Sequence, residues 1–219
     1  MPVSEDPLRD AVIFHPTDGP DADDVETAWS FLTASEKERA RRFHFAKDRH
    51  RWIRGRAWIR QELARTLGQP AASIFISAKP GGRLYLPDHP GIDFNLSHTG
   101  CWIALGICQA GWIGVDIETI EPAFPALEIA EEFFLPQERA WIAEGGVERF
   151  FQLWTAKEAL MKATGRGMSL PPDKILVAIR DGRPATVTHL ETGDTYPVTT
   201  WLGPGDTIAA MLVIRASSF

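Results

Sequence analysis

Two carboxylates separated by one residue occur in the segment Gly114-Val115-Asp116-Ile117-Glu118. Residues two apart on an extended strand share one face, so Asp116 and Glu118 would point the same way while Val115 and Ile117 face a core. Two neighbouring carboxylates repel each other unless a cation relieves them. Hard divalent cations such as Mg²⁺ prefer oxygen ligands of this kind. The pair therefore indicates a metal site, although the same spacing also fits the solvent-facing end of a strand.

A third acidic residue lies in the segment Trp154-Thr155-Ala156-Lys157-Glu158-Ala159-Leu160-Met161-Lys162. Apolar positions at helical spacing predict a helix over about 147–164, and Gly165 is a suitable C-terminal stop. Glu158 and Lys162 are four residues apart and project from one face of that helix. Alone, such a pair is most often a solvated ion pair. Beside the strand carboxylates, Glu158 would complete the metal site.

Two further segments, Asn95-Leu96-Ser97-His98 and Gly81-Gly82-Arg83, carry groups that suit a phosphate or a ribose. Ser97 and His98 are adjacent on an extended chain and point to opposite sides, which disfavours a nucleophile–base pair. No Gly-x-Ser-x-Gly elbow surrounds the serine. The small backbone of the two glycines lets a ligand approach, and the arginine after them suits a phosphate. The alternatives are a loop-capping serine with a satisfied histidine, and an ordinary hairpin turn.

The elements that must position these residues predict an α+β fold. Helices are expected over about 25–32, from a capping box at 33–36 onward, and over 48–67, 126–134, 137–143 and 147–164. Strands are expected over 11–14 (an edge strand), 83–86, 102–107, 112–117, 175–179, 186–189, 198–202 and 208–214. The strands at 102–107 and 112–117 are expected to pair with each other, and Asp181-Gly182 predicts a hairpin turn. Each half reads as helices followed by strands, so we expect two similar lobes, 1–112 and 113–219.

The composition is that of a folded globular protein. Hydrophobic residues make up 44% of the 219 residues, and eight tryptophans argue against disorder. Charged residues interrupt every apolar stretch before the roughly 18 residues that a membrane helix needs. The N-terminus carries acids and is unlike a secretory signal, so we expect a cytoplasmic protein. Cys101 and Cys108 lie along one extended segment, which disfavours a disulfide between them, and no Cys-x-x-Cys pair indicates zinc.

The net charge of −6 is unevenly distributed. Residues 36–65 hold eleven Lys and Arg against four Asp and Glu, which gives this segment a charge of +7 and the remainder −13. A basic stripe on an acidic protein indicates a local anionic partner rather than general nucleic-acid binding. The alternative is a solvated helix face that carries arginine. The buried stripe of the helix over 48–67 is expected to contain Trp52, Ile59, Leu63 and Leu67. Elsewhere around the helix we expect Arg51, Arg54 and Arg60.

Three of these segments, in this order and spacing, resemble the signature blocks of the 4′-phosphopantetheinyl transferases. They are Phe94-Asn95-Leu96-Ser97-His98, Ile113-Gly114-Val115-Asp116-Ile117-Glu118 and Trp154-Thr155-Ala156-Lys157-Glu158-Ala159-Leu160-Met161-Lys162. Each block alone is weak, whereas three in register are specific. The chain is most similar to the surfactin-synthetase-type group, and the resemblance runs from about residue 35 to residue 170. It implies a monomer whose two α+β lobes are related by pseudo-two-fold symmetry.

The resemblance also implies a reaction. The enzyme would move the phosphopantetheine arm of coenzyme A onto a serine of an apo acyl or peptidyl carrier protein and release adenosine 3′,5′-bisphosphate. It would use Mg²⁺, with Mn²⁺ as the alternative, and neither nucleic acid nor a membrane would be a partner. Fatty-acid, polyketide, nonribosomal-peptide and lysine-pathway carriers are all compatible with the motifs.

Residue by residue, the family's metal ligands correspond to Asp116, Glu118 and Glu158. Its contacts to coenzyme A correspond to Arg51, Gly82, Arg83, Asn95, Ser97, His98 and Lys162. Lys162 would contact the pyrophosphate, and His98 would lie near the 3′-phosphate. The catalytic residues would be Glu158, Lys162 and His98, with Glu158 or a metal-bound water that it positions accepting the proton of the carrier serine.

Two other classes of function fit the same residues. Clustered carboxylates also serve magnesium-dependent nucleases and phosphodiesterases. A non-catalytic module that binds coenzyme A or a carrier protein would keep the carboxylates for structure alone.

The sequence also departs from the family pattern, because Thr155 stands where Ser or Cys is usual and Gly82-Arg83-Leu84 replaces Gly-Lys-Pro. The arginine keeps a positive charge at that position.

Overall fold

The structure, a computed structural model, describes residues 12–19, 22–109 and 111–215 and has the α+β class that the sequence predicts. The helices are α1 (Val25–Ser30), α2 (Ala34–Arg41), α3 (Ala46–Leu67), α4 (Ala126–Phe133) and α5 (Pro136–Ala163). The strands are β1 (Val12–Pro16), β2 (Ser77–Ala78), β3 (Leu84–Tyr85), β4 (Ile92–Thr99), β5 (Trp102–Gln109), β6 (Gly111–Thr119), β7 (Ile175–Arg180), β8 (Arg183–His189), β9 (Thr195–Pro197), β10 (Thr199–Leu202) and β11 (Thr207–Arg215).

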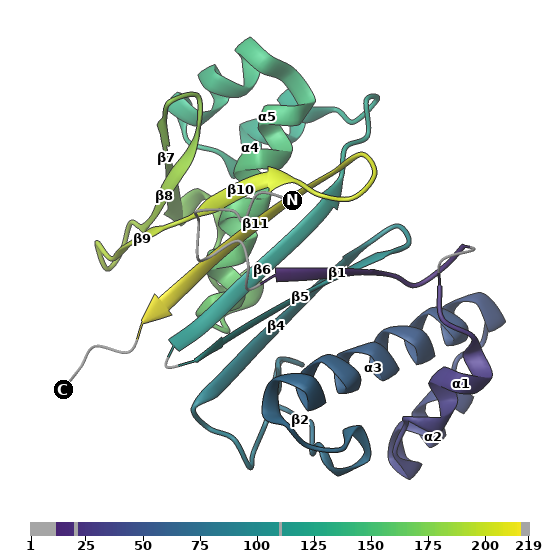
Figure 1. The fold of residues 1–219 in the computed structure, drawn as a ribbon. Coiled ribbons are helices and arrows are strands. Elements are labelled where there is room, and N and C mark those ends of the chain that lie inside the picture. Colours follow the sequence, from purple (N-terminus) through teal and green to yellow (C-terminus); the bar gives the residue numbers. More distant parts are fainter. Residues whose placement is uncertain (1–11, 20–21, 110, 216–219) are drawn as a thin grey trace.

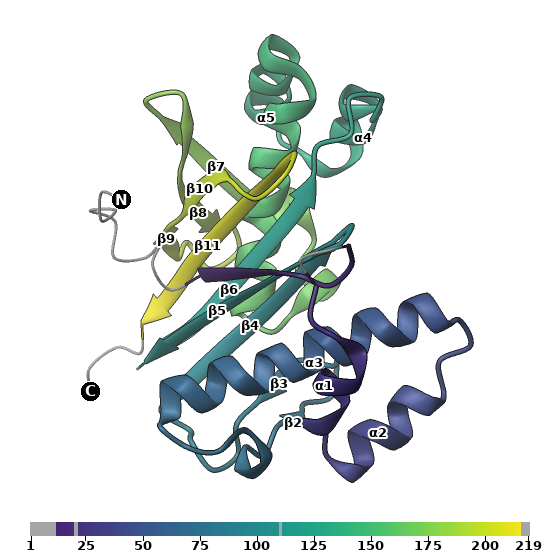
Figure 2. The ribbon, with the colours of Figure 1, turned by 45° about the vertical axis from the view of Figure 1, so that its right-hand side comes forward.

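The first sheet has the strand order β1-β5-β4 and is antiparallel throughout. Helix α3 runs across one face of it (Figure 1, Figure 2). Ile59 and Leu63 of the helix pack against Phe94 of β4 and Leu105 of β5 in one buried cluster. Strand β1 forms the sheet edge that the sequence predicts, although residue 11 of the predicted strand lies outside the described residues.

The second sheet has the strand order β10-β11-β6, and α5 packs on it. Ala156 and Leu160 of α5 share a buried cluster with Ile208 and Leu212 of β11. The helix is interrupted at Gly146, whose φ of 69° and ψ of −147° are non-helical. The interruption separates the two helices predicted over 137–143 and 147–164. A third antiparallel sheet, β7-β8-β9, contains the predicted hairpin, and β2 pairs with β3.

The predicted pairing of the strands at 102–107 and 112–117 is wrong. Strand β5 pairs with β1 and β4, whereas β6 pairs with β11, so the two consecutive strands belong to different sheets. They meet face to face instead, and a Cβ added to Gly106 of β5 would lie 2.4 Å from the side chain of Val115 in β6. Apolar contacts across this shared face, which includes Ala104, Ile113 and Val115, hold the two strands together in place of the backbone hydrogen bonds of a hairpin.

The edge of β6 that does not pair with β11 is bound by side chains of β4. Asp93 accepts from the backbone N–H of residue 113 (2.8 Å), Asn95 from that of residue 115 (2.9 Å) and Thr99 from that of residue 119 (3.1 Å). Because side chains at every second position of a strand share a face, one face of β4 supplies the acceptors for these three backbone donors of β6. This seam of side-chain bonds sets the register between the two sheets.

Arginine is less exposed on α3 than the sequence indicates. Arg60, expected away from the buried stripe, is only 2% exposed. Its Nε donates to Glu36 Oε2 (2.7 Å), and its Nη1 donates to the carbonyl oxygens of Ala71 and Ile74 (2.8 Å each). Glu36 also closes the predicted capping box with Thr33 at the start of α2. Burial of this guanidinium is possible because all of these acceptors surround it.

Within residues 12–19, 22–109 and 111–215, none of the helices combines the length and apolar character required to span a bilayer.

Candidate active site

Asp116 is the centre of a buried polar cluster where β4, β6 and α5 meet. The residue is 2% exposed. Its Oδ1 accepts hydrogen bonds from Ser97 Oγ (2.8 Å) and Lys162 Nζ (2.6 Å), and Lys162 Nζ also donates to Ser97 Oγ (2.8 Å). Its Oδ2 is buried and has no hydrogen-bond partner among the described residues. A buried carboxylate oxygen without a donor is costly, and it suits a cation.

Glu118 and Glu158 lie near enough to this aspartate for their pKa values to respond to its charge. Burial raises the pKa of Glu118 to about 7, and the nearby carboxylates of Asp116 and Glu158 raise it too, against the opposing effect of Lys162. Burial, followed by the charge of Asp116, raises the pKa of Glu158 as well. A strand and a helix therefore bring three carboxylates into one neighbourhood, where each makes it harder for the others to ionise.

These residues fit a hard divalent cation. As they stand, no three His, Cys, Asp or Glu side chains in the described parts of the chain surround one point closely enough to hold an ion. The buried Oδ2 of Asp116 nevertheless has no donor, and burial and the charge of Asp116 raise the pKa of both glutamates, so a cation at this place would favour the ionised form of all three. Both glutamates are partly exposed, whereas Asp116 is buried. The donor set is all oxygen, which matches Mg²⁺ or Mn²⁺.

The turn of α5 that presents Glu158 is anchored by its neighbour Lys157, which is fully buried. Lys157 Nζ donates to Glu138 Oε2 (2.7 Å) and to the carbonyl oxygen of Pro172 (2.9 Å). The second oxygen of Glu138 accepts from the backbone N–H of Val177 (2.8 Å). The pair joins the two parts of α5 across the interruption at Gly146 and ties them to the segment that follows the helix, and both charges are satisfied where no water reaches them.

The C-terminal end of α5 is held by Arg83. Its guanidinium donates to Asp93 Oδ2 (2.5 Å), to the carbonyl oxygen of Ile113 (3.0 Å) and to the carbonyl oxygen of Lys162. The arginine thus joins the β3–β4 region to β6 and to α5. Its contacts fix the backbone of the residue whose ammonium binds Asp116.

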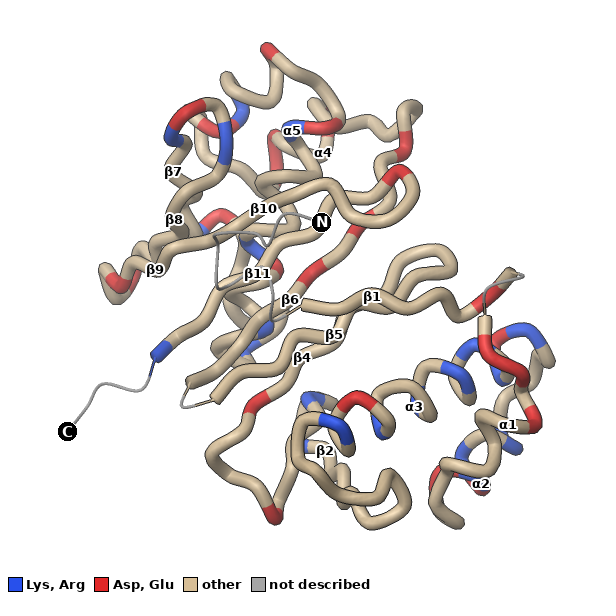
Figure 3. The backbone as a smooth tube through the Cα atoms, in the orientation of Figure 1, with Lys and Arg blue, Asp and Glu red and all other residues tan. Residues whose placement is uncertain are grey.

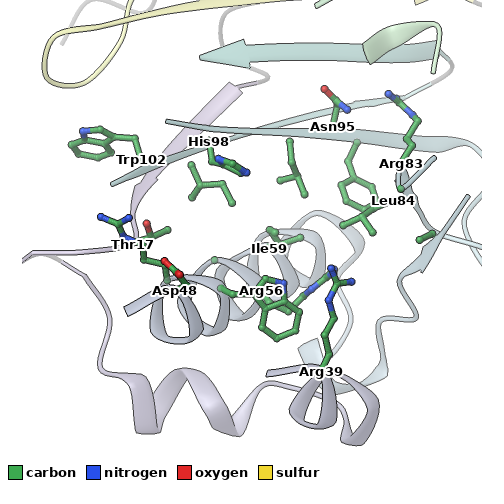
Figure 4. A pocket seen from close by; sticks show the side chains of 18 of the residues that line it. Thr17, Arg39, Asp48, Arg56, Ile59, Arg83, Leu84, Asn95, His98 and Trp102 are labelled. Atoms are coloured by element: carbon green, nitrogen blue, oxygen red, sulfur yellow. The ribbon is translucent and has the colours of Figure 1, made fainter. Parts of the chain in front are cut away.

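A cavity of about 660 Å³ lies on the other side of β4, above α3 (Figure 4). Apolar residues such as Ile59 and Leu96 form part of its wall. Its charged and polar lining consists of Thr17, Arg39, Asp48, Arg51, Arg56, Arg83, Asn95 and His98. An apolar pocket with a few charged groups of mainly one sign suits an aromatic ligand that carries phosphate. Figure 3 shows that Lys and Arg residues gather along α2 and α3, the side of the molecule on which this cavity lies.

The predicted site residues fall into two groups, one on each side of β4. Arg51, Gly82, Arg83, Asn95 and His98 line the cavity. Ser97, Lys162 and the three carboxylates form the Asp116 cluster. Ser97 and His98 point to opposite faces, as their adjacency on a strand predicts. A ligand that reached both groups would run from the cavity past the edge of β4 to the acidic cluster.

Several of the cavity residues are already engaged. Arg51 Nη2 donates to Asp18 Oδ2 (3.1 Å), while its buried Nε has no partner among the described residues. Asn95 uses its amide oxygen on the backbone of Val115, and Arg83 has the three acceptors given above. His98 is exposed at the cavity. Direct binding of a ligand by each of these side chains stays a prediction.

Sequence reasoning did not single out Arg39, Trp52 and Arg56 as a group. Both guanidinium carbons lie 5.5 Å from the Trp52 ring centroid, and all three residues line the cavity. Trp52 and Arg56 are four apart on α3, a spacing that places them on one helix face and is visible in the sequence. Arg39 comes from α2, and only the packing of α2 on α3 brings it to the same place.

Comparison with known proteins accounts for both halves of the chain. The family model described as the 4′-phosphopantetheinyl transferase superfamily matches residues 113–211, and the one described as 4′-phosphopantetheinyl transferase, N-terminal, matches residues 19–109. The chain is 34% identical to 4′-phosphopantetheinyl transferase ffp of Bacillus subtilis, over 74% of this chain and 73% of that protein.

Two further relatives bear names of the same kind. The chain is 32% identical to 4′-phosphopantetheinyl transferase Sfp of Bacillus subtilis (strain 168), over 72% of this chain and 71% of that protein. It is 30% identical to 4′-phosphopantetheinyl transferase HetI of Nostoc sp., over 90% of this chain and 84% of that protein. The two family models and these relatives show that the chain belongs to the 4′-phosphopantetheinyl transferase family.

Proposed function

We propose that this enzyme transfers the 4′-phosphopantetheine arm of coenzyme A to a serine of an apo acyl or peptidyl carrier protein, with release of adenosine 3′,5′-bisphosphate. The observation that carries the proposal is the Asp116 cluster, in which Lys162 and three carboxylates lie across β4 from a basic cavity of about 660 Å³. A ligand with a nucleotide at one end and a pyrophosphate beside it matches this pairing of sites.

The acidic cluster would hold the ion that the reaction needs. We propose Asp116, Glu118 and Glu158 as ligands of Mg²⁺, with Mn²⁺ as the alternative. When bound, the ion would supply positive charge at the pyrophosphate, where negative charge builds up as the bond breaks. Lys162 would place a second positive charge at the same group, and Ser97 would hold the Lys162 ammonium in position through its hydroxyl.

The transfer needs one proton acceptor. The hydroxyl oxygen of the carrier serine attacks the phosphorus that bears the pantetheine arm, and the bond from that phosphorus to the bridging oxygen breaks. The electron pair leaves on adenosine 3′,5′-bisphosphate. We propose that Glu158 accepts the serine proton, either directly or through a water that it positions. The nucleophile belongs to the partner protein, which is consistent with the lack of a nucleophile–base pair in the motifs.

The cavity would bind the nucleotide end of coenzyme A. Arg51, Gly82, Arg83, Asn95 and His98 are the proposed contacts, because they line it. In the same proposal the chain divides into lobes 1–112 and 113–219, with the nucleotide mainly on the first lobe and the acidic cluster mainly on the second. We also propose that the enzyme is a monomer and acts in the cytoplasm.

The test is transfer itself. The chain is incubated with coenzyme A, Mg²⁺ and an apo carrier protein, and the carrier is weighed by mass spectrometry. We expect a mass gain of one phosphopantetheine arm, lost in Glu158→Gln and retained in Glu148→Gln, a control at an exposed position of the same helix. Cleavage of a phosphodiester without transfer would support a phosphodiesterase instead. Binding of coenzyme A without turnover would support a binding module.

A further inference from the structure

Asp93 of β4 binds two other parts of the chain through a single carboxylate oxygen. Its side chain is 14% exposed. Its Oδ2 accepts from the backbone N–H of Ile113 in β6 (2.8 Å) and from Nη2 of Arg83 (2.5 Å). The same Nη2 also donates to the carbonyl oxygen of Ile113 (3.0 Å). The carboxylate, the guanidinium and one residue of β6 therefore form a closed ring of hydrogen bonds.

The guanidinium connects this ring to the last turn of α5. Arg83 Nη1 donates to the carbonyl oxygen of Lys162, and Figure 4 shows the arginine side chain directed away from α3. Carbonyl groups of a last helical turn lack N–H partners within the helix, and a cation beside them is favourable. The charge-assisted bond to Asp93 keeps the guanidinium at this place, because such bonds are strong and directional. Asp93 thus acts on the backbone of Lys162 through Arg83.

Two bridges join the same three elements, and both include Lys162. In the first, Ser97 of β4, Asp116 of β6 and the Lys162 ammonium are bonded to one another. In the second, the ring at Asp93 joins β4 and β6 to the backbone carbonyl of the same lysine. Asp93 and Ser97 are an even number of positions apart, so they share one face of β4. A long side chain such as lysine loses much rotamer freedom when its head is fixed, and a fixed backbone limits the positions that the head can reach.

We infer that Asp93 is a positioning residue for the transfer. By holding Arg83 against the last turn of α5, it places the Lys162 ammonium where the reaction needs it. The inference rests on the proposed function, in which this ammonium faces the pyrophosphate. A preorganised charge lowers a barrier only where it meets the developing charge, and a misplacement of about 1 Å can cost roughly a hundredfold in rate. Loss of the Asp93 charge should therefore slow the chemical step.

Asn95 indicates which substitution isolates this effect. Its amide oxygen accepts from the backbone N–H of Val115 (2.9 Å), the same kind of bond that Asp93 makes to the N–H of residue 113. Asp93→Asn can therefore keep the bond to β6, whereas it brings no charge to Arg83. Because Arg83 loses a competing carboxylate, its attraction for a phosphate does not weaken, and KM for coenzyme A should not rise.

The experiment measures kcat and KM for coenzyme A on the full chain, with Mg²⁺ and one apo carrier. Wild type is compared with Asp93→Asn and with the control Asp88→Asn, which removes one negative charge from an exposed position shortly before β4. We expect Asp93→Asn to lower kcat roughly ten- to a hundredfold and to leave KM within about threefold. The control should match wild type within about twofold.

A double-mutant cycle tests whether Asp93 acts through Lys162. In the Lys162→Met background no ammonium remains to be positioned, so Asp93→Asn should change kcat less than about twofold. A fall of roughly tenfold or more in that background would show that Asp93 acts independently of the lysine, and it would overturn the inference. An unchanged kcat in Asp93→Asn alone, or a loss that appears only in KM, would overturn it as well.

Hydrogen exchange separates the inference from the proposed function, because it needs no turnover. The amides of Thr164 and Gly165 close the last turn of α5. Asp93→Asn should speed their exchange several-fold, while the amides of the first part of α5, over 136–145, keep the wild-type rate. If wild type transfers nothing, the proposed function fails, and faster exchange confined to the last turn still supports the positioning contact. Unchanged exchange at these amides, or faster exchange along the whole helix, overturns it.

Discussion

The ammonium of Lys162 and the carboxylate of Asp116 lie 2.6 Å apart, although the residues are 46 positions apart in the sequence and come from a helix and a strand. The contact uses Oδ1 of the aspartate, and Ser97 binds the same oxygen. Oδ2 is the oxygen left for an ion. Lys162 can therefore stay beside Asp116 while a cation binds, and the two positive charges would meet a pyrophosphate together.

Removal of the Lys162 ammonium should slow transfer far more than it weakens binding of coenzyme A. In Lys162→Met, Asp116 Oδ1 loses the hydrogen bond from the ammonium and keeps the one from the Ser97 hydroxyl. Loss of one preorganised positive group at a developing charge typically lowers kcat roughly 100- to 1,000-fold. Initial rates of carrier modification measure this. Lys174→Met, at a half-exposed position away from the cluster, is the control. A kcat within threefold of wild type would remove Lys162 from the reaction.

A divalent ion should stabilise the folded protein through the same cluster. A ligand that binds only the folded state adds free energy of unfolding by mass action, about 2.7 kcal/mol at a hundred times its Kd. Mg²⁺ should therefore raise the Tm of wild type and not that of Asp116→Asn, as measured by differential scanning fluorimetry. Glu148→Gln should keep the full shift. A Tm shift that persists in Asp116→Asn would place the ion elsewhere.

The local patterns of the site were predictable from the sequence. Period two on a strand places Asp116 and Glu118 together, and period 3.6 on a helix places Glu158 and Lys162 on one face. The capping box at Thr33 is confirmed as well, because it involves only residues close in sequence. Each of these features depends on spacing along the chain and on a single element.

The errors concern partners that lie far apart in the sequence. Strands β5 and β6 follow each other closely in the sequence, a spacing that is typical of a hairpin. Strand β6 nevertheless pairs with β11. Asp93 of β4, 20 residues before the backbone N–H that it binds, satisfies part of the other edge. Likewise Arg60 is buried because Glu36, 24 residues earlier, reaches it. Neither side-chain contact has a periodic signal that the sequence could reveal.

Glu118 should make the stability of the metal-free protein depend on pH. Its pKa is about 7 in the folded protein against an ordinary 4.5, so folding favours the protonated acid. The stability that this contributes is fully present below pH 4.5 and is lost as the pH rises through 7. Glu118→Gln, which mimics the protonated form, should therefore melt above wild type at pH 8, and the difference should shrink toward pH 5.

The measurement is Tm against pH in the presence of EDTA, with Glu148→Gln as the baseline for an exposed glutamate of α5. A gain for Glu118→Gln that is the same at pH 5 and pH 8 would contradict the raised pKa. Excess Mg²⁺ should reverse the order at pH 8, because wild type then gains the ion and the variant has lost one ligand.

Replacement of Gly114 by alanine should strongly destabilise the folded protein. A Cβ there would lie 1.8 Å from the carbonyl oxygen of Ala159, a backbone atom of α5 that cannot turn aside. Gly114→Ala must push the helix that carries Glu158 and Lys162 away from the strand that carries Asp116. We expect a loss of about 1–3 kcal/mol of stability or more, as overpacked cores show, together with a lower kcat.

The matched control for Gly114→Ala is Gly91→Ala, since a Cβ at Gly91 has no atom within 4 Å. That variant should melt within about 0.5 kcal/mol of wild type and transfer normally. Because misplacement of reacting groups by about 1 Å can cost a hundredfold in rate, Gly114→Ala protein that remains folded at low temperature should still be slow. If it melts early yet reaches the wild-type kcat when folded, the close approach of α5 to β6 serves stability alone and does not align Lys162 with Asp116.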